Sequence, residues 1–224
     1  MKKFFEEILK NQKRGTKTIE DRKLDALTFD DGPSNITEAV LDILKEEGIV
    51  GTFFLIGQNI TPDKKPILER QLAQGCEICN HSFTHSVMSE LSAETIRDEI
   101  MKTSDVIRDM VGVETMFFRP PFIALSDTMY ANINMPFICG HDSRDWDPST
   151  SAQDRVNNVL AGVRDGSLVL MHDMKDNVKT LEALPMIIKE LRAKGFSFVT
   201  ASQIFAEKGI DPNIPHKIWS NVFD

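Results

Sequence analysis

Residues 26–56 read ALTFDDGPSNITEAVLDILKEEGIVGTFFLI, and this stretch indicates the fold most clearly. The apolar segment 26–29 is predicted to be a strand that stops at Asp-Asp-Gly-Pro, residues 30–33, because Gly and Pro are strong turn signals. A helix is predicted over 36–47, with its apolar residues on one face, and a second strand over 50–56, which is rich in β-branched and aromatic residues. The order strand, helix, strand is typical of a parallel sheet.

The same alternation continues through the rest of the chain. Further strands are predicted at 77–78, 116–118, 136–139, 167–171 and 196–199. Further helices are predicted at 63–74, 92–110, 152–163 and 178–193. About seven strand–helix units indicate an α/β fold in which parallel strands form a distorted (β/α) barrel with outer helices. In such folds the chemistry lies at the carboxyl ends of the strands.

Length and charge restrict the domain organisation and the partners. A chain of 224 residues fits one domain with a substantial core. We divide it into an N-terminal extension (1–23), polar and expected to be helical, a main domain (24–206) and a surface tail (207–224). The net charge of -8 argues against a nucleic-acid-binding face. No apolar run is long enough to span a bilayer, and charged residues near the N-terminus leave no room for the apolar core of a signal peptide.

The three cysteines are expected to be free thiols. Three cysteines in a chain of this length do not resemble a disulfide framework. Cys76 and Cys79 have the spacing of half a zinc site, but they flank a predicted strand, where residues three apart point to opposite faces. Two such thiolates are unable to share one metal.

Polar clusters follow the predicted strands, and two of them suit a metal. The adjacent carboxylates Asp30 and Asp31 repel each other, so both stay ionised only beside a cation, although a simple capped turn has the same composition. His81 and His85 are spaced to lie on one face of a helical turn and to chelate one metal, unless they are a chance surface pair. Two imidazoles and one carboxylate leave a coordination position open for water, as in catalytic metal sites.

Three further clusters offer acid, base and pocket residues. In Arg119-Pro-Pro-Phe122 two prolines remove backbone donors, which leaves the Phe122 amide available and fixes Arg119; a structural turn is the alternative. His172 ends a predicted strand and becomes a catalytic candidate if a carboxylate such as Asp145 orients it. Trp146 is either a core residue or the wall of a sugar or acetyl pocket.

In this order the five clusters resemble the five-motif signature of the polysaccharide deacetylase family, also known as NodB-homology domains or carbohydrate esterase family four. The resemblance runs from about residue 24 to residue 200, and residues 48–54 are similar to the second strand of that family. It implies a distorted barrel of the NodB-homology type and makes residues 24–206 the deacetylase catalytic domain.

The resemblance also implies a metal and a base. One divalent ion, zinc first with cobalt or nickel as alternatives, is held by Asp31, His81 and His85. The metal polarises the acetyl carbonyl and lowers the pKa of bound water. Asp30 is the implied general base, and Arg119 holds it ionised and aimed.

The remaining implied roles concern the oxyanion, the leaving group and the acetyl pocket. The backbone N–H of Phe122, together with the metal, stabilises the tetrahedral oxyanion. His172, oriented by Asp145, is the general acid that protonates the leaving amine or alcohol. Leu170 and Trp146 line the pocket for the acetyl methyl group.

One residue departs from the family pattern. Members usually carry glycine after the arginine-proline-proline-aromatic segment, whereas this chain has Ile123. A β-branched residue does not easily adopt the positive φ open to glycine, so we expect a locally different loop and an altered substrate fit.

The implied activity is hydrolysis of N-acetyl groups on a carbohydrate polymer or oligomer, with release of acetate. This makes the chain a hydrolase of carbon–nitrogen bonds in linear amides, and peptidoglycan N-acetylglucosamine is the first choice of substrate. A chitin-oligosaccharide deacetylase, an acetylxylan esterase, a small-amide hydrolase and a silent sugar-binding module are the alternatives. Asp30, Arg119 and His172 argue against the last. A monomer is expected, and the substrate class places it in the cell envelope although the chain shows no signal peptide.

Overall fold

The structure is a computed structural model that describes residues 22–224. The N-terminal extension predicted for 1–23 lies outside the described residues, apart from Arg22 and Lys23. Lys23 already belongs to the first strand.

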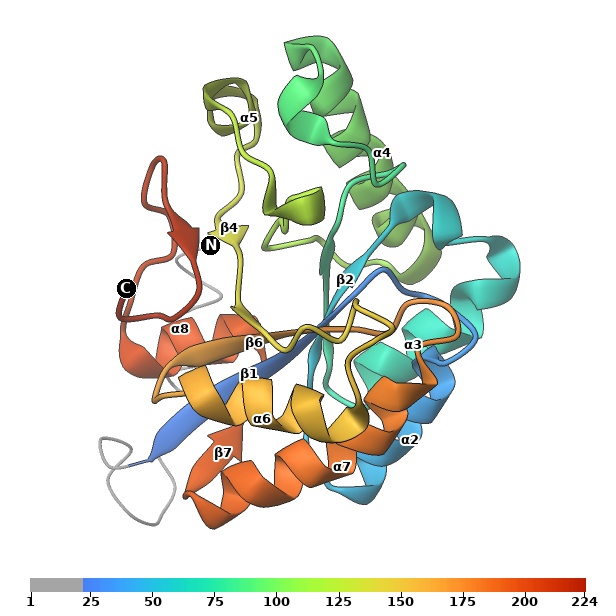
Figure 1. Ribbon diagram of the computed structural model, residues 1–224. Coiled ribbons are helices and arrows are strands. Elements are labelled where there is room, and N and C mark those ends of the chain that lie inside the picture. Colours follow the sequence, from blue (N-terminus) through green and yellow to red (C-terminus); the bar gives the residue numbers. More distant parts are fainter. Residues whose placement is uncertain (1–21) are drawn as a thin grey trace.

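Within residues 22–224, six strands form the central sheet in the order β3-β2-β1-β6-β5, with β7 also paired to β1 (Figure 1). Every ladder in this sheet is parallel. The strands are β1 (Lys23–Asp30), β2 (Thr52–Leu55), β3 (Glu77–Asn80), β5 (His141–Asp142), β6 (Ser167–His172) and β7 (Phe196–Phe198). A separate parallel pair consists of β4 (Phe137–Ile138) and β8 (Ile218–Trp219).

Single bridges connect this sheet to the separate strand pair. Parallel bridges join Asn80 to Phe118 and Phe118 to Phe137, and so connect β3 to β4. β4 pairs with β8, and β5, the next strand along the chain, pairs with β6. The predicted parallel α/β fold of the distorted-barrel type is confirmed. The strand predicted at 116–118 is reduced to bridges at Phe118, so no continuous ladder closes the ring among the described residues.

Helices cover the sheet as the alternation predicts. They are α2 (Thr37–Glu46), α3 (Lys65–Ala73), α4 (Ala93–Val111), α5 (Asp127–Asn132), α6 (Ala152–Gly162), α7 (Val178–Ala193) and α8 (Ala201–Lys208). Short 3-10 helices occur at Gly57–Asn59, Pro62–Lys64, Met88–Glu90 and Pro121–Ile123. The sequence did not predict α5 and α8, which are short. None of the helices within residues 22–224 has the length and apolarity needed to cross a bilayer.

The two faces of β1 pack into different cores. Leu27 and Phe29 belong to a large cluster with residues of α2, α3, α6 and α7, whereas Leu24 and Ala26 belong to a second cluster with residues of α8 and β8. Because side chains alternate along a strand, each face of the sheet is buried. Cys76 joins the first cluster and Cys79 the second, and both are free, so the prediction that they point to opposite faces is confirmed.

The C-terminal segment is more deeply packed than a surface tail. Residues 207 and 208 still belong to α8, and β8 pairs with β4. Trp219 is 1% exposed, and its indole N–H donates to the Pro212 carbonyl over 3.0 Å. The segment therefore contributes to the core, because Trp219 and Val222 belong to the same hydrophobic cluster as Leu24 and Ala26 of β1.

Candidate active site

Three potential metal ligands converge at the carboxyl ends of β1 and β3. Asp31 Oδ1 lies 3.4 Å from His81 Nε2 and 3.3 Å from His85 Nε2, and one ligand atom from each residue falls within 4.8 Å of the others. Asp31 Oδ1 is buried and accepts no hydrogen bond from the described residues. A buried carboxylate oxygen is expensive to leave unsatisfied. The set of one carboxylate and two imidazoles therefore fits a divalent metal with one coordination position open.

The loop that carries the histidines is irregular, and the predicted helical turn from His81 to His85 is wrong. Ser82 and His85 have positive φ values of 63° and 60°, and Asp31 has a φ of 74°. Non-glycine residues in this region are strained, and such strain concentrates at functional sites. The histidine rings converge because the loop folds back, not because they share a helix face.

A buried carboxylate on α4 holds this loop. Glu99, which is 7% exposed, accepts hydrogen bonds from the backbone N–H of Phe83 over 2.9 Å and of Thr84 over 2.8 Å. It also accepts the Thr84 hydroxyl over 2.9 Å. Glu99 therefore fixes the segment between the two histidines, and the sequence analysis missed it because the contact joins residues that are 15 or 16 positions apart.

The protonation states suit ligand roles. His81 Nδ1 lies 2.7 Å from the Arg119 carbonyl, which accepts only, so Nδ1 carries a hydrogen and Nε2 is the ring nitrogen that faces Asp31 and the metal position. Burial and the charge of His81 lower the pKa of His85, which favours the neutral ring. Burial raises the pKa of Asp31, but close contact with His81 and the charges of the surrounding histidines outweigh it and lower the pKa to about 2.

Asp30 is held by a buried ion pair. The Arg119 guanidinium donates to Asp30 Oδ1 over 2.5 Å, and the two side chains are 0% and 3% exposed. The guanidinium also lies over the Phe54 ring, 4.1 Å from its centroid. The second oxygen, Oδ2, lies 3.6 Å from His81 Nε2, so Asp30 keeps one oxygen free toward the metal ligands.

The Arg119–Phe122 segment forms a turn with unusual backbone angles. The amides of Ile123 and Ala124 donate to the carbonyls of Pro120 and Pro121, and no backbone partner is found for the Phe122 amide among the described residues. The expectation that Ile123 would avoid positive φ is wrong, since Phe122 and Ile123 have φ values of 58° and 53°. The loop keeps this shape because the two prolines and the turn hydrogen bonds determine it.

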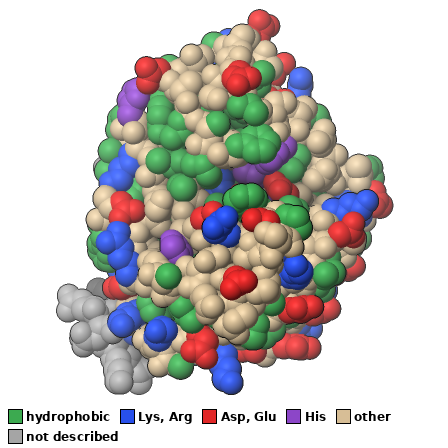
Figure 2. All heavy atoms as spheres, viewed as in Figure 1, with side chains coloured by type: hydrophobic (Ala, Val, Ile, Leu, Met, Phe, Trp, Pro, Cys, Tyr) green, Lys and Arg blue, Asp and Glu red, His purple; other side chains and the backbone are tan. Residues whose placement is uncertain are grey.

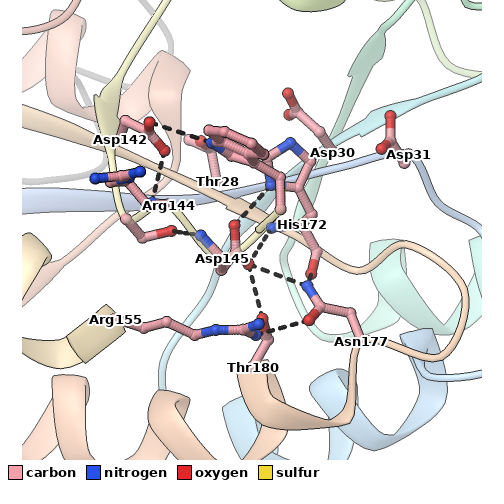
Figure 3. Close-up of polar contacts among 12 residues, drawn as sticks. Thr28, Asp30, Asp31, Asp142, Arg144, Asp145, Arg155, His172, Asn177 and Thr180 are labelled. Atoms are coloured by element: carbon pink, nitrogen blue, oxygen red, sulfur yellow. Dashed lines mark hydrogen bonds and ion pairs between the residues drawn. The ribbon is translucent and has the colours of Figure 1, made fainter. Parts of the chain in front are cut away.

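His172 and Asp145 form a bonded pair on the opposite side of the site (Figure 3). His172 Nδ1 donates to Asp145 Oδ1 over 2.7 Å, and the His172 backbone N–H donates to Oδ2 over 2.8 Å. Burial lowers the pKa of His172, but the Asp145 charge and hydrogen bond outweigh it and raise the pKa to about 9. The pKa of Asp145 is lowered, since its contacts with His172 and Thr180 outweigh burial. The imidazolium is thus the stable form at neutral pH.

These groups line one cavity of about 450 Å³. Its lining residues are Asp30, Asp31, His81, His85, Pro120, Phe122, Ile123, Cys139, Gly140, Asp142, Trp146, Leu170 and His172. In Figure 2, histidine and acidic side chains lie between hydrophobic ones on this face of the molecule. Trp146 is 49% exposed and donates its indole N–H to Asp142 over 3.2 Å, so it is a cavity wall rather than a core residue.

A further buried carboxyl group braces the Asp30–Asp31 turn. Asp173 accepts the Thr37 hydroxyl over 2.5 Å and donates its backbone N–H to the Asp30 carbonyl over 3.1 Å. Burial and the charges of Asp31 and Asp30 raise its pKa to about 7, against the effect of the Thr37 hydrogen bond. Its place next to His172 was visible in the sequence, but its contact with the turn depends on the tertiary fold.

Comparisons with known proteins agree on one family. Residues 17–136 match the family model described as polysaccharide deacetylase. The chain is similar to a bifunctional xylanase/deacetylase of Pseudobutyrivibrio xylanivorans, with 49% identity over 93% of this chain and 34% of that protein. It is also similar to the peptidoglycan-N-acetylglucosamine deacetylase PgdA of Listeria monocytogenes, with 34% identity over 82% of this chain and 39% of that protein. The chain thus spans only about a third of the length of these curated relatives.

A solved structure shares both fold and sequence with this chain. It is a family 4 acetyl xylan esterase from Clostridium thermocellum in complex with a cobalt ion, with a TM-score of 0.86 and 39% identity. The alignment covers 89% of this chain and 99% of that one. The described fold is therefore shared with this esterase over nearly the whole length of both aligned chains.

Proposed function

Since this chain belongs to the polysaccharide deacetylase family, we propose that it is a metal-dependent hydrolase that removes acetyl groups from a carbohydrate. The observation that carries this proposal is the unsatisfied, buried Asp31 Oδ1 between His81 and His85. It lies on the same cavity as a paired Asp30 and a paired His172.

Asp31, His81 and His85 would hold one divalent ion. Bound there, the ion supplies a Lewis acid that polarises the acetyl carbonyl and lowers the pKa of bound water. The cobalt ion in the related esterase supports a transition metal at this site, and nitrogen-rich ligand sets of this kind suit zinc, cobalt or nickel.

Asp30 is the general base. Its Oδ1 is occupied by Arg119, so Oδ2 is the oxygen that accepts a proton from the attacking water. Because Arg119 is fully buried and stacked on Phe54, it holds the Asp30 carboxylate in one orientation. The Phe122 amide then offers a hydrogen-bond donor for the oxyanion that develops on the acetyl oxygen.

His172 is the general acid. Its Nδ1–H is bound to Asp145, which leaves Nε2–H for the leaving group. As the bond between the acetyl carbon and the sugar oxygen or nitrogen breaks, its electron pair stays on the sugar atom, which takes the Nε2 proton. A pKa of about 9 keeps this proton available at neutral pH.

Acetylated xylan is the proposed substrate. The relative with 49% identity is named a xylanase/deacetylase, and the related structure is an acetyl xylan esterase. The peptidoglycan N-acetylglucosamine deacetylase is 34% identical. This ranking reverses the order derived from the sequence alone. Peptidoglycan remains the second candidate, since that relative also covers 82% of this chain.

Acetate release tests the reaction and the substrate together. Purified protein is assayed on acetylated xylan, peptidoglycan and chitin oligomers, before and after chelation, with Asp30→Asn as the matched variant. We expect chelator-sensitive release that is fastest on xylan and is restored by cobalt or zinc. Faster release from peptidoglycan would replace the substrate proposal, and turnover of small amides alone would refute carbohydrate specificity. Sugar binding without turnover, unchanged in Asp30→Asn, would indicate a binding module.

A further inference from the structure

Arg155 is a buried cation that has no carboxylate partner among the described residues. It lies in the first turn of α6 and is 1% exposed. Its NH1 group donates to Asn177 Oδ1 over 2.6 Å and to Thr180 Oγ1 over 2.8 Å. Within residues 22–224, none of its contacts is an ion pair, and its Nε has no partner. Burying a guanidinium in this way is expensive, which raises the question of what the charge acts on.

Both acceptors of Arg155 continue to Asp145. Thr180 donates its hydroxyl to Asp145 Oδ2 over 2.7 Å, and Asn177 Nδ2 lies 3.4 Å from the same oxygen. The Thr180 oxygen accepts from Arg155 through a lone pair, and its one hydrogen is donated to Asp145. Figure 3 shows these contacts between Arg155, its two acceptors and Asp145.

The network ends on His172. Asp145 is fully buried, and its Oδ1 receives the His172 Nδ1–H while Oδ2 receives the His172 backbone N–H. Asn177 also donates to the His172 carbonyl over 3.3 Å. The ring, the backbone and the carboxylate are therefore held by groups that depend on Arg155 for their orientation.

We propose that Arg155, acting through Thr180 and Asn177, is a positioning residue that aims His172 at the leaving group. The proposal rests on the proposed function in one respect, the role of His172 as general acid. Arg155 itself does not line the cavity and has no direct contact with the reacting atoms.

This role predicts a dependence on the leaving group. When a sugar acetate is cleaved, the sugar oxygen departs with the bonding electron pair and must take the proton from His172, because a sugar alkoxide is a poor leaving group. A 4-nitrophenolate is stable as an anion near neutral pH and departs without that proton. A misaimed His172 therefore slows the first reaction and spares the second, whereas a general loss of structure slows both.

The test compares Arg155→Met, Thr180→Val and Arg155→Lys with Arg192→Met, an exposed control on α7. Each variant is assayed on acetylated xylo-oligosaccharides and on 4-nitrophenyl acetate. For Arg155→Met and Thr180→Val we expect kcat on the sugar to fall about 30-fold or more with KM nearly unchanged, and the aryl ester rate to stay within about threefold. Arg155→Lys should recover part of the loss because an ammonium can reach the same acceptors. Equal losses on both substrates, or no loss on either, overturn the proposal.

A spectroscopic readout keeps the test independent of sugar hydrolysis. The His172 Nδ1–H in its hydrogen bond to Asp145 should give a downfield proton resonance, assigned by its absence in His172→Gln. This resonance should shift or disappear in Thr180→Val, which keeps the shape of threonine and replaces the hydroxyl with a methyl group. An unchanged resonance refutes the positioning role of Arg155, whether or not the wild type cleaves sugar acetates. If the wild type does not cleave them, the proposed function fails separately.

Discussion

Replacing Arg119 with Met leaves Asp30 buried without its cation. Arg119 and Asp30 are 0% and 3% exposed at the side chain and are joined over 2.5 Å. Methionine keeps most of the volume and the contact with the Phe54 ring, so the loss is mainly electrostatic. Breaking a buried pair in this way costs about 3–5 kcal/mol. For a domain of this size, that cost corresponds to a decrease in Tm of about 6–20 °C.

The assay is urea unfolding of metal-free protein at pH 7, which measures the free energy of unfolding. The double variant Asp30→Asn with Arg119→Met removes both charges and should recover at least about half of the loss, since no unpaired ion is left in the interior. The reasoning is refuted if Arg119→Met costs less than about 1 kcal/mol, which is the range of an exposed pair. It is also refuted if the double variant loses the sum of the single losses.

Three further predictions concern the acid, the substrate loop and the metal loop. Burial lowers the pKa of His172, but Asp145 outweighs it and raises the pKa to about 9, so sugar deacetylation should persist up to about pH 8 and fall as the pH rises through 9. In Asp145→Asn this alkaline limb of the pH profile should move to lower pH. A limb that stays in place contradicts the role of His172 as general acid. Ile123→Gly relieves a positive φ of 53°, which stabilises the folded state by about 1–2 kcal/mol. The greater backbone entropy of glycine in the unfolded state opposes this by about 0.5–1 kcal/mol. Calorimetry should therefore show Tm higher by about 1–4 °C, and a lower Tm would mean that the loop is not strained. Glu99→Ala frees the Phe83 and Thr84 amides and should weaken cobalt binding about 10- to 100-fold in an absorbance titration. Glu94→Ala, at the exposed start of α4, is the control. Equal cobalt affinities of the two variants would show that Glu99 does not support the metal site.

The order of strands and helices was largely readable from the sequence, because apolar periodicity and turn residues carry that information. The prediction for 178–193 coincides with α7. The helix α8 was missed because it is short, although Thr200 and Gln203 form a capping box at its start. The strand expected at 116–118 is nearly absent because its pairing is limited to single bridges at Phe118, a feature that depends on partners distant in sequence.

The site was predicted as a set of residues but not as a geometry. The family resemblance implied Asp31, His81 and His85 as one ligand set, and the structure brings them within contact. It could not show that the histidines meet through a loop with positive φ, since neither Ser82 nor His85 signals that backbone. The role of Arg155 was not predicted, because its partners Asn177 and Thr180 lie 22 and 25 residues away in the chain.

Cobalt titration of metal-free protein, combined with acetate release, tests the central claim most directly. We expect one equivalent of cobalt per chain, with acetate release from acetylated xylan restored in proportion to the metal bound. Both readouts should be lost in Asp31→Asn, His81→Gln and His85→Gln and retained in His216→Gln, which lies outside the cavity. Full acetate release from thoroughly chelated protein, or one equivalent of cobalt still bound tightly in all three ligand variants, would contradict it.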